Sequence, residues 1–420
     1  MRQYFHGLWA SRCREAGLPG NAMTGRVRQG FRWGGIAAAA VLALGACSSS
    51  FDRFTTPMTP ANEPTEAPPG AAVPAGPGGV RVALILPLSA QGNAGAAAQS
   101  MKNAADMAIA EFRNPDIQLL VKDDGGTPQG AQAAAQQSLD EGAAIIVGPL
   151  FAQSVSTVGQ VARSRGVPVL AFSTDANVAT RGVYLLSFLP ESDVHRIVEF
   201  GASRGKRAIA AMIPENAYGG VAEAALQAAA ARRNARVVAI ERYSADPARL
   251  QAAAQRIAQA AARADALFIP DGADALPQVL NALAAANLNL RRVQLLGTGL
   301  WDDPRISSIP QLQGGWYAAP DGTGFRNFAQ RYRARYGSEP VRTATLAYDA
   351  VALIAQLIKA QGPQAFSEQV LANSSGFAGI DGIFRLRTDG TNERGLAVMQ
   401  VSPSGPQVIS PSPRAFGPGT

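Results

Sequence analysis

The sequence has very few of the residues from which metal centres, disulfides and covalent active sites are built. Its 420 residues include two cysteines, Cys13 and Cys47, and two histidines, His6 and His195. Removal of an amino-terminal export signal leaves one residue of each kind. A zinc site, an iron–sulfur cluster, a Cys–His pair and a disulfide framework are therefore not expected, and no cofactor is predicted.

The net positive charge is also small once residues 1–46 are set aside. The formal net charge is +7, from 38 Lys and Arg against 31 Asp and Glu. Residues 1–46 hold six Arg and one acid, which is a net of +5 and leaves +2 for the remainder. A chain with this balance has no basic footprint for nucleic acid.

The amino terminus has the pattern of a lipoprotein export signal. A basic segment, residues 25–33, precedes a short apolar run, residues 36–44, and small residues then lead to Cys47. These features define a secretory signal, and the run is too short to span a bilayer. Leu44–Cys47 resembles the bacterial lipobox, which implies lipidation of Cys47 after cleavage of residues 1–46. An ordinary signal with an unrelated cysteine is the alternative, and Met23 is an alternative start.

Residues 47–79 predict a lipidated tether. Seven prolines and a glycine-rich end give a composition that cannot form a packed core. Ser48 follows the cysteine, and by resemblance to the sorting rules of Gram-negative lipoproteins this implies the periplasmic side of the outer membrane. We expect contact with the membrane through the lipid anchor only.

From Val80 onward, short apolar bursts alternate with Ala-rich helical stretches. The predicted strands are Val80–Leu86, Ile117–Val121, Ala144–Val147, Val167–Ala171, Ala208–Ile213, Arg236–Ile240, Ala266–Ile269 and Val293–Leu296. The predicted helices are Asn93–Phe112, Pro128–Glu141, Gln153–Arg165, Asp193–Arg204, Ala222–Arg233, Pro247–Ala262 and Ala273–Ala286. Continuous apolar strands separated by helices indicate an α/β fold with parallel sheets buried on both faces. Ligands of such sheets bind beyond the carboxyl ends of the strands.

The carboxyl-terminal part has a different pattern. Two helices, 325–336 and 343–360, are predicted before a β-hairpin that joins 379–386 to 395–401 around Asp389-Gly390. The segment from Ser402 is expected to carry little structure.

Four segments resemble the type I periplasmic binding proteins of the leucine-binding group. They are Val80–Ser89, Ile146–Leu150, Gly166–Ser173 and Pro214–Gly219. The resemblance runs from about Val80 to Ile409 and implies two lobes that close on a ligand in the Venus-flytrap manner. It implies lobe one at 80–189 and 316–376, lobe two at 190–315 and 377–410, and a flexible tail at 411–420.

Two further segments, Leu295–Asp303 and Leu312–Pro320, are similar to the branch of this fold known as penicillin-binding-protein activators. That resemblance implies a non-enzymatic lipoprotein that binds and activates a peptidoglycan synthase, a penicillin-binding protein. The alternative is the substrate-binding component of an ABC transporter, which would carry amino acids or similar small polar ligands to a permease.

The family resemblance also implies the residues of a ligand cleft. In lobe one they are Ser89, Ser154, Ser173, Thr174 and Asp175. Hydroxyls and helix-start amides suit the carboxylate of an amino acid, and an acid suits its ammonium group. In lobe two they are Tyr218 and Asp271, the latter placed where the family keeps an ammonium-binding acid. Helix-capping and turn roles are the alternative for each of them.

Two weaker patterns point to chemistry that we do not expect. Ser192-Asp193-Val194-His195 contains the residue types of a catalytic triad, but one histidine at a helix start lacks the other elements of such a site. Asp123-Asp124 could attract a hard cation, yet no third acid follows at loop spacing, so a strand-ending turn is preferred. We predict neither catalysis nor a metal site.

Overall fold

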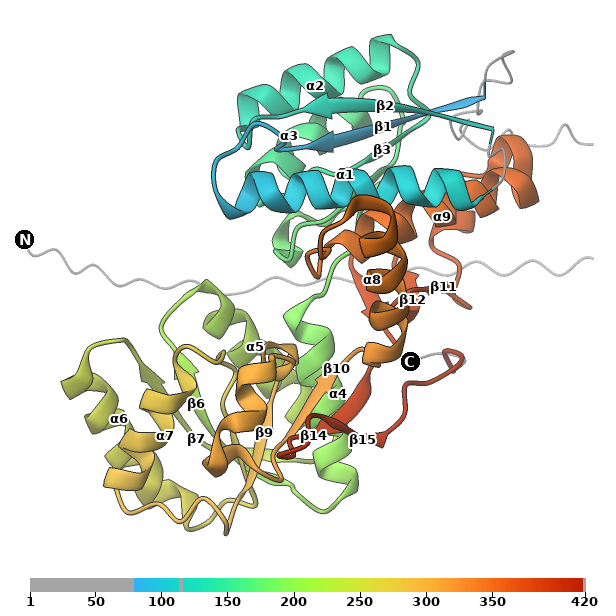
Figure 1. Ribbon diagram of the computed structural model, residues 1–420. Coiled ribbons are helices and arrows are strands. Elements are labelled where there is room, and N and C mark those ends of the chain that lie inside the picture. Colours follow the sequence, from blue (N-terminus) through green and yellow to red (C-terminus); the bar gives the residue numbers. More distant parts are fainter. Residues whose placement is uncertain (1–78, 113–115, 418–420) are drawn as a thin grey trace, which may run out of the picture. The chain divides into compact units, whose positions relative to one another are not determined.

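The computed structural model describes residues 79–112 and 116–417 (Figure 1). The predicted signal peptide, the predicted lipidation site at Cys47 and all of the predicted tether except Gly79 lie outside the described residues. Within the part of the chain that is described, no helix is both long enough and apolar enough to cross a membrane.

The chain folds into two α/β lobes, as predicted, and the sheet of lobe one is entirely parallel. Its strand order is β2-β1-β3-β4-β5. The strands are β1 (Val80–Leu86), β2 (Ile117–Asp123), β3 (Ile145–Val147), β4 (Val169–Ala171) and β5 (Val183–Leu185). The helices that pack with this sheet are α1 (Asn93–Glu111), α2 (Pro128–Asp140), α3 (Ala152–Arg163), α8 (Gly322–Tyr336), α9 (Ala344–Gln361) and α10 (Glu368–Leu371).

Lobe two is built on a seven-stranded sheet of order β15-β14-β10-β9-β8-β6-β7. Strands β10 to β7 are mutually parallel, whereas β14 and β15 join antiparallel. The strands are β6 (Ala208–Pro214), β7 (Arg236–Tyr243), β8 (Ala266–Phe268), β9 (Gln294–Gly297), β10 (Trp316–Ala319), β14 (Ala397–Gln400) and β15 (Gln407–Ser410). The helices are α4 (Pro190–Ser203), α5 (Ala217–Arg232), α6 (Pro247–Ala261) and α7 (Leu276–Ala285).

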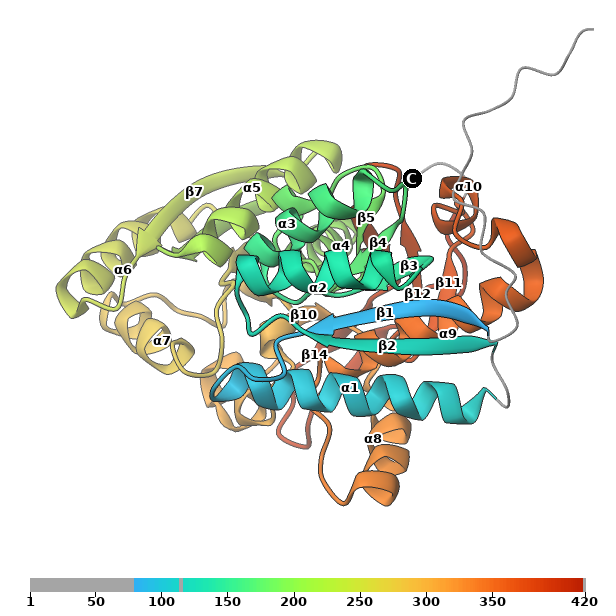
Figure 2. The same ribbon diagram turned by 90° about the horizontal axis from the view of Figure 1, so that it is seen from above.

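Burial on both faces explains the continuous apolar strands. In β1, Val82, Leu84 and Leu86 belong to a core under α1 and α9, while the alternate residues Ala83 and Ile85 belong to a second core under α2 and α3. Figures 1 and 2 show α1 and α2 on opposite sides of β1 and β2. Side chains that alternate across a strand can fill two cores only if every position is apolar.

Local signals set where the helices begin. Thr127, Asn216, Asp246 and Asp321 each accept a hydrogen bond from a backbone N–H in the first turn of the helix that follows. Proline occupies the first turn of α2, α4, α6 and α7, where its missing N–H is not needed.

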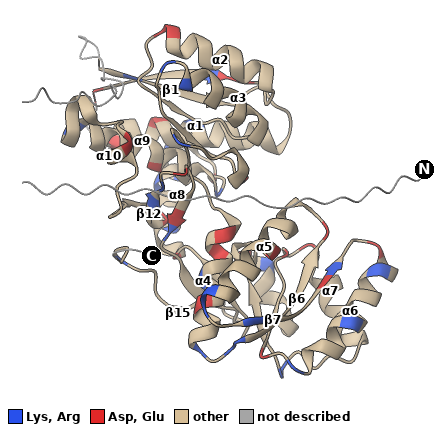
Figure 3. Cartoon of the chain, turned by 180° about the vertical axis from the view of Figure 1, so that it is seen from behind, with Lys and Arg blue, Asp and Glu red and all other residues tan. Residues whose placement is uncertain are grey.

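Charged side chains protect the exposed edge of the lobe-two sheet. Strand β7 is the last strand in the order, so one side of its backbone has no partner strand among the described residues. Arg242 on this strand holds Glu223 of α5 through two hydrogen bonds of 2.7 and 2.8 Å, and Arg256 of α6 pairs with Glu241. Figure 3 shows charged residues spread over both lobes, including β7 and α6. Charges along an edge disfavour pairing with another chain.

A third sheet, of order β11-β12-β13, lies where the carboxyl-terminal part returns between the lobes. It consists of β11 (Phe377–Gly379), β12 (Gly382–Leu386) and β13 (Asn392–Arg394). Asn392 donates to the carbonyl oxygens of Leu185 and Ser187, and Arg394 Nε donates to the latter at 2.9 Å. The third sheet is therefore hydrogen-bonded to the end of β5 and to the segment that follows it, which is the first connection between the two lobes.

Three expectations about the carboxyl-terminal part need correction. We placed 316–376 in lobe one, but β10 at Trp316–Ala319 is an inner strand of the lobe-two sheet. The hairpin turn at Asp389-Gly390 joins β12 to β13, whereas β14 pairs with β10 instead. The segment after Ser402 contains β15, because its Gln407–Ser410 stretch pairs with β14.

Candidate functional site

Five of the predicted ligand residues lie where strands of lobe one end. Ser89 follows β1, Ser154 lies in the first turn of α3 after β3, and Ser173, Thr174 and Asp175 follow β4. Because β1, β3 and β4 are adjacent and parallel, these residues share one edge of the sheet. That edge is where open α/β sheets bind ligands.

Most of these side chains already have partners inside lobe one. The Ser89 N–H donates to Asp123 Oδ1 at 3.2 Å; burial opposes ionisation of Asp123, but hydrogen bonds from Ser89 and from a neighbouring glycine N–H lower its pKa. Ser173 Oγ accepts from the Asp175 N–H at 3.1 Å, and Asp175 itself caps a 3₁₀ turn. The turn and capping roles therefore account for Ser173 and Asp175. Thr174 is exposed and bonds to none of the described side chains.

Ser154 differs because it lies beneath the surface against a carboxyl group. Ser154 and Asp124 are each 1% exposed, and Ser154 Oγ and Asp124 Oδ2 both lack a hydrogen-bond partner. Burial raises the pKa of Asp124, while the N–H of Gly126 and the nearby Ser154 hydroxyl oppose that rise. The sequence pattern predicted Asp123-Asp124 as a turn, and the turn is present, but Asp124 points inward.

The two residues predicted in lobe two also lie at strand ends. Tyr218 is in the first turn of α5, after β6, and its hydroxyl donates to Thr298 Oγ1 at 2.7 Å. Asp271 follows β8 and accepts hydrogen bonds from the Tyr243 hydroxyl and from the N–H of Gly272. Burial raises the pKa of Tyr218, and the negative charges of Asp193 and Asp271 add to the rise, so this hydroxyl stays protonated. The structure thus gathers Tyr218 and Asp271 with Thr298, Tyr243 and Asp193, none of which was predicted as a ligand residue.

The most informative of the unpredicted residues is Asp193. It lies in the first turn of α4, and its Oδ2 accepts from the N–H of Gly299 at 2.9 Å, across 106 positions of sequence. Its other oxygen has no partner among the described residues. Burial raises the pKa of Asp193 to about 7. Desolvated carboxyl groups with a shifted pKa are common at functional sites.

Asp193 belonged to the triad-like run in the sequence, and its neighbour His195 shows why that pattern carries no catalysis. His195 Nε2 lies 2.8 Å from Arg232 Nη2, so the neutral imidazole accepts a hydrogen bond from the guanidinium. Burial, together with the positive charge of Arg232, lowers the pKa of His195 to about 4. A histidine held in this way is not a general base near neutral pH.

We expect His195 to make the fold sensitive to acid. The unfolded chain protonates this histidine below its ordinary pKa near 6.5, whereas the native state resists until about pH 4. Stability is therefore complete above pH 6.5 and falls as the pH drops toward 4. Between about pH 7 and pH 5, urea unfolding of the wild type should lose about 1 kcal/mol more than unfolding of His195→Gln, after allowance for partial exposure. Equal losses in the two proteins would contradict the assignment.

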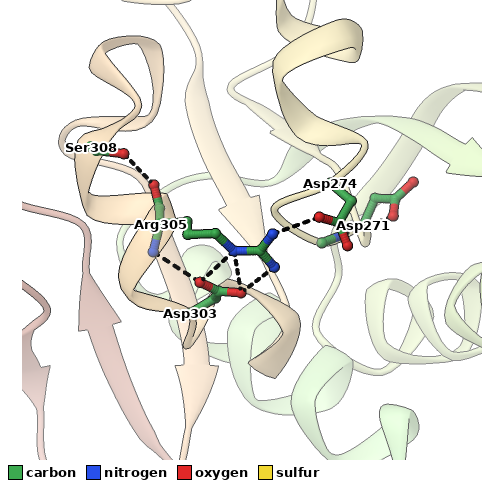
Figure 4. A network of polar contacts seen from close by, with 6 residues as sticks. Asp271, Asp274, Asp303, Arg305 and Ser308 are labelled. Carbon is green, nitrogen blue, oxygen red and sulfur yellow. Dashed lines mark hydrogen bonds and ion pairs between the residues drawn. The ribbon is translucent and has the colours of Figure 1, made fainter. Parts of the chain in front are cut away.

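An arginine joins the two strand-end loops beside Asp271 (Figure 4). Arg305 donates through Nη1 to Asp274 at 2.6 Å and through Nη2 to Asp303 at 2.7 Å. Asp274 belongs to the loop after β8, and Asp303 to the segment after β9. The guanidinium thereby fixes the loops that carry Asp271 and Thr298, although it contacts neither of those two residues.

The described residues hold a small cavity but no metal cluster. The cavity, of about 240 Å³, lies beside Trp301, Asp302 and Tyr317, and none of the predicted ligand residues lines it. Across residues 79–112 and 116–417, no three His, Cys, Asp or Glu side chains are grouped to hold a metal ion.

Comparisons with known proteins agree with this architecture. The family model described as "Periplasmic binding protein" matches residues 79–406. A search of curated proteins finds no match. Among solved structures, a putative branched-chain amino acid ABC transporter protein from Rhodospirillum rubrum is similar over 79% of this chain and all of that one, with TM-score 0.70 and 18% identity.

Two further structures show the range of ligands that the fold accepts. A leucine binding protein from Thermotoga maritima is 17% identical, with TM-score 0.56, over 81% of this chain and 99% of that one. An ABC transporter solute binding protein from R. palustris in complex with benzoate is also 17% identical, with TM-score 0.56, over 81% of this chain and 98% of that one. At such identities the likeness establishes the fold, and the family match covers most of the chain. The chain therefore belongs to the periplasmic binding protein family and has the type I, leucine-binding-protein-like fold.

Proposed function

We propose that this protein is the substrate-binding component of an ABC transporter, which holds a small polar ligand in the periplasm and delivers it to a membrane permease. The observation that carries the proposal is the convergence of Tyr218, which follows β6, Thr298, which follows β9, and Asp193, in the first turn of α4. A hydroxyl and a half-desolvated carboxyl group at that edge suit the capture of a polar ligand. Members of the family are binding proteins rather than enzymes, which agrees with the role of His195.

The proposal includes location. A periplasmic site accords with the family, and an anchor at Cys47 would keep the protein near a membrane. The lipid, the outer-membrane placement and the tether remain predictions from the sequence.

Ligand binding is the property to test, and Tyr218 offers a specific variant. We expect titration calorimetry with the twenty amino acids, their amides, small amines and aromatic acids to find a ligand with Kd near the micromolar range, about −8 kcal/mol. Tyr218→Phe should weaken that ligand about tenfold, because it removes one hydrogen-bonding group from the edge of the site.

Tyr336→Phe is the matched control. Its hydroxyl also donates one bond of 2.7 Å, to the carbonyl oxygen of Asn103, but it lies on α8 of lobe one. The control should lose some stability and keep the wild-type affinity. Equal affinity losses in the two variants would show that Tyr218 acts through folding alone.

Activation of a peptidoglycan synthase is the second candidate, and a specific observation favours it. Five of the seven predicted ligand residues, Ser89, Ser173, Asp175, Tyr218 and Asp271, use their side chains to bond other parts of their own lobe. Side chains bonded in this way have a structural role, which is compatible with a protein whose partner is another protein. If no small molecule in the panel binds and the protein retains a penicillin-binding protein in a pull-down, the second candidate replaces the first.

A further inference from the structure

The edge at which the parallel strands of lobe two begin is rich in basic side chains. Strands β9, β8, β6 and β7 are adjacent and parallel, so the residues that precede them share this edge, which is opposite to the edge of the candidate site. Backbone hydrogen bonds support the proximity, because the N–H of Arg236 donates to Arg207 and the N–H of Asp265 donates to Ala208. Helices α4 and α5 each lead into one of these strands, so their carboxyl-terminal ends lie here as well.

Nine basic residues belong to this edge, and we call them the basic rim. All of them except Lys206 are exposed, and Figure 3 shows basic positions in the loops at the lower end of lobe two. The segments that form the edge, 199–207, 232–236, 261–265 and 286–293, also contain two acids, so their net charge is +7. The rim consists of Arg204, Lys206, Arg207, Arg232, Arg233, Arg236, Arg263, Arg291 and Arg292. The small net charge of the chain beyond residue 46 conceals this concentration.

Most of the rim has no partner inside the protein. Glu199 pairs with Arg233, and Arg232 lies against a histidine. The second acid, Asp265, accepts from two backbone N–H groups and holds no side chain of the rim. The other seven rim side chains form no ion pair and no side-chain hydrogen bond with any residue in 79–112 or 116–417. Seven unpaired positive charges are therefore concentrated at one edge of one sheet.

Stabilisation of helix ends does not account for the rim. Basic residues near helix carboxyl termini interact favourably with the helix dipole, so some excess is expected at such an edge. Lobe one also alternates helices with parallel strands, yet Arg165 and Arg181 at its corresponding edge pair with Asp140 and Glu368. The segments 140–144, 163–168 and 179–182 of that edge hold three basic and two acidic residues. The large excess is therefore a property of lobe two.

The composition of the rim fits a surface that carries phosphate groups. Eight of its nine residues are arginine, whose planar guanidinium forms paired hydrogen bonds with phosphate oxygens. The large apolar side chains that are exposed among the described residues, Phe151, Leu300 and Val408, all lie elsewhere. A rim without them lacks the apolar centre of a typical protein interface. These observations favour a layer of mobile anionic headgroups over a protein partner.

We infer that the basic rim docks lobe two on an anionic phospholipid bilayer. The sequence predicts an export signal and a lipid anchor at Cys47, and the rim adds a second, electrostatic contact with the membrane. A lipid chain and a polybasic patch together hold a protein at a membrane more firmly than either does alone. Docking by this edge leaves the candidate site of lobe two free, because that site lies at the opposite ends of the same strands. The inference does not depend on the transport function.

Vesicle binding tests the inference without the anchor. The exported chain, residues 47–420, is prepared with Cys47→Ser so that no lipid is attached. We expect it to cosediment with phosphatidylcholine vesicles that contain about 30% phosphatidylglycerol at about 50 mM salt, and not with vesicles of phosphatidylcholine alone. Binding should be lost at about 1 M salt, where the Debye length is about 3 Å.

A triple variant of the rim locates the contact. Arg263→Gln, Arg291→Gln and Arg292→Gln together remove three exposed charges that have no ion-pair partner among the described residues. Vesicle binding should weaken about 100-fold, since each basic residue near an anionic surface contributes about fivefold. Lysine at the same three positions keeps the charge, so this second variant should bind within about threefold of the wild type.

Lobe one supplies the matched control. Arg163→Gln, Arg165→Gln and Arg181→Gln remove three exposed charges from the corresponding edge of its sheet, so the net charge falls by the same amount. Vesicle binding should stay within about threefold of the wild type, because charges farther than a Debye length from the bilayer contribute little. Thermal melting should show that both glutamine variants remain folded.

The outcomes separate a bilayer from other partners. Equal losses in the two glutamine variants would mean that only the net charge matters, and would overturn the assignment to the rim. Loss of binding in the lysine variant would indicate a specific phosphate site and would overturn the bilayer. Absence of binding to anionic vesicles at low salt would also overturn the inference, and capture by polyglutamate would then assign the rim to an acidic protein. Vesicle binding and ligand titration are independent measurements, so failure of one leaves the other conclusion intact.

Discussion

Replacement of Arg342 by methionine is expected to lower the free energy of unfolding by about 3–5 kcal/mol, because it leaves the carboxylate of Asp381 buried without its cation. Arg342 Nη2 and Nη1 lie 2.6 and 3.0 Å from the two oxygens of Asp381, whose side chain is fully buried. The guanidinium also lies over the rings of Phe188 and Phe325, at 4.8 and 4.6 Å. The side chain of Arg342 therefore joins the turn before α9 to α8, to the third sheet and to the first connection between the lobes. Urea unfolding at neutral pH measures the effect.

The charge explanation has its own control. Asp381→Asn removes the buried charge and keeps an acceptor for the Thr345 hydroxyl, which donates to Asp381 Oδ2 at 2.6 Å. In the double variant with Arg342→Met, no charge is stranded, so the double variant should be more stable than Arg342→Met alone. Additive losses would indicate that Arg342 acts mainly through its packing on the two rings.

Trp301→Ala should have an effect of similar size, about 3–5 kcal/mol, because it removes one of the largest buried side chains of lobe two. Trp301 is 1% exposed and packs 6.3 Å from the ring of Tyr317. It follows the loop that holds Thr298 and Gly299 against Tyr218 and Asp193. Trp301→Phe, which keeps most of the volume, should cost clearly less in the same unfolding experiment.

Gly297 supplies a second, sharper test of the same contact. A Cβ atom at Gly297 would lie 2.1 Å from the indole of Trp301, which no real pair of atoms tolerates. Gly297→Ala should therefore be strongly destabilising in the wild type and much milder in the Trp301→Ala background, where the space is free. Equal costs in both backgrounds would mean that the indole does not occupy this position.

The order of strands and helices could be predicted because each long apolar burst fills two cores. Strands β1, β2, β6 and β9 lie within a few residues of the predicted ranges. Strands β5 and β10 were missed because they are only three and four residues long, and β10 in addition pairs with β14, which is distant in sequence. Strand β15 was missed because it is a four-residue edge strand that lies between Pro- and Ser-rich segments and none of its residues is fully buried.

The sequence predicted which loops carry the candidate site residues, but it did not predict the contacts that these residues make. Strand ends are readable from the sequence, so Ser154 and Tyr218 were placed at the correct edges. Asp193 was not singled out as a ligand residue, since its role depends on the N–H of Gly299, which only the folded sheet brings near. Asp124 gave the same difficulty: a turn pattern does not reveal which of two adjacent carboxylates points inward.

The account rests on the binding of a small molecule, and native mass spectrometry of the protein purified from the cells that make it tests this most directly. We predict a mass excess from a bound small molecule, which is released on denaturation, regained on incubation with that molecule, and reduced in Tyr218→Phe. A protein that carries no small molecule, binds none of the compounds in the titration panel and copurifies with a cell-wall synthase would contradict the account.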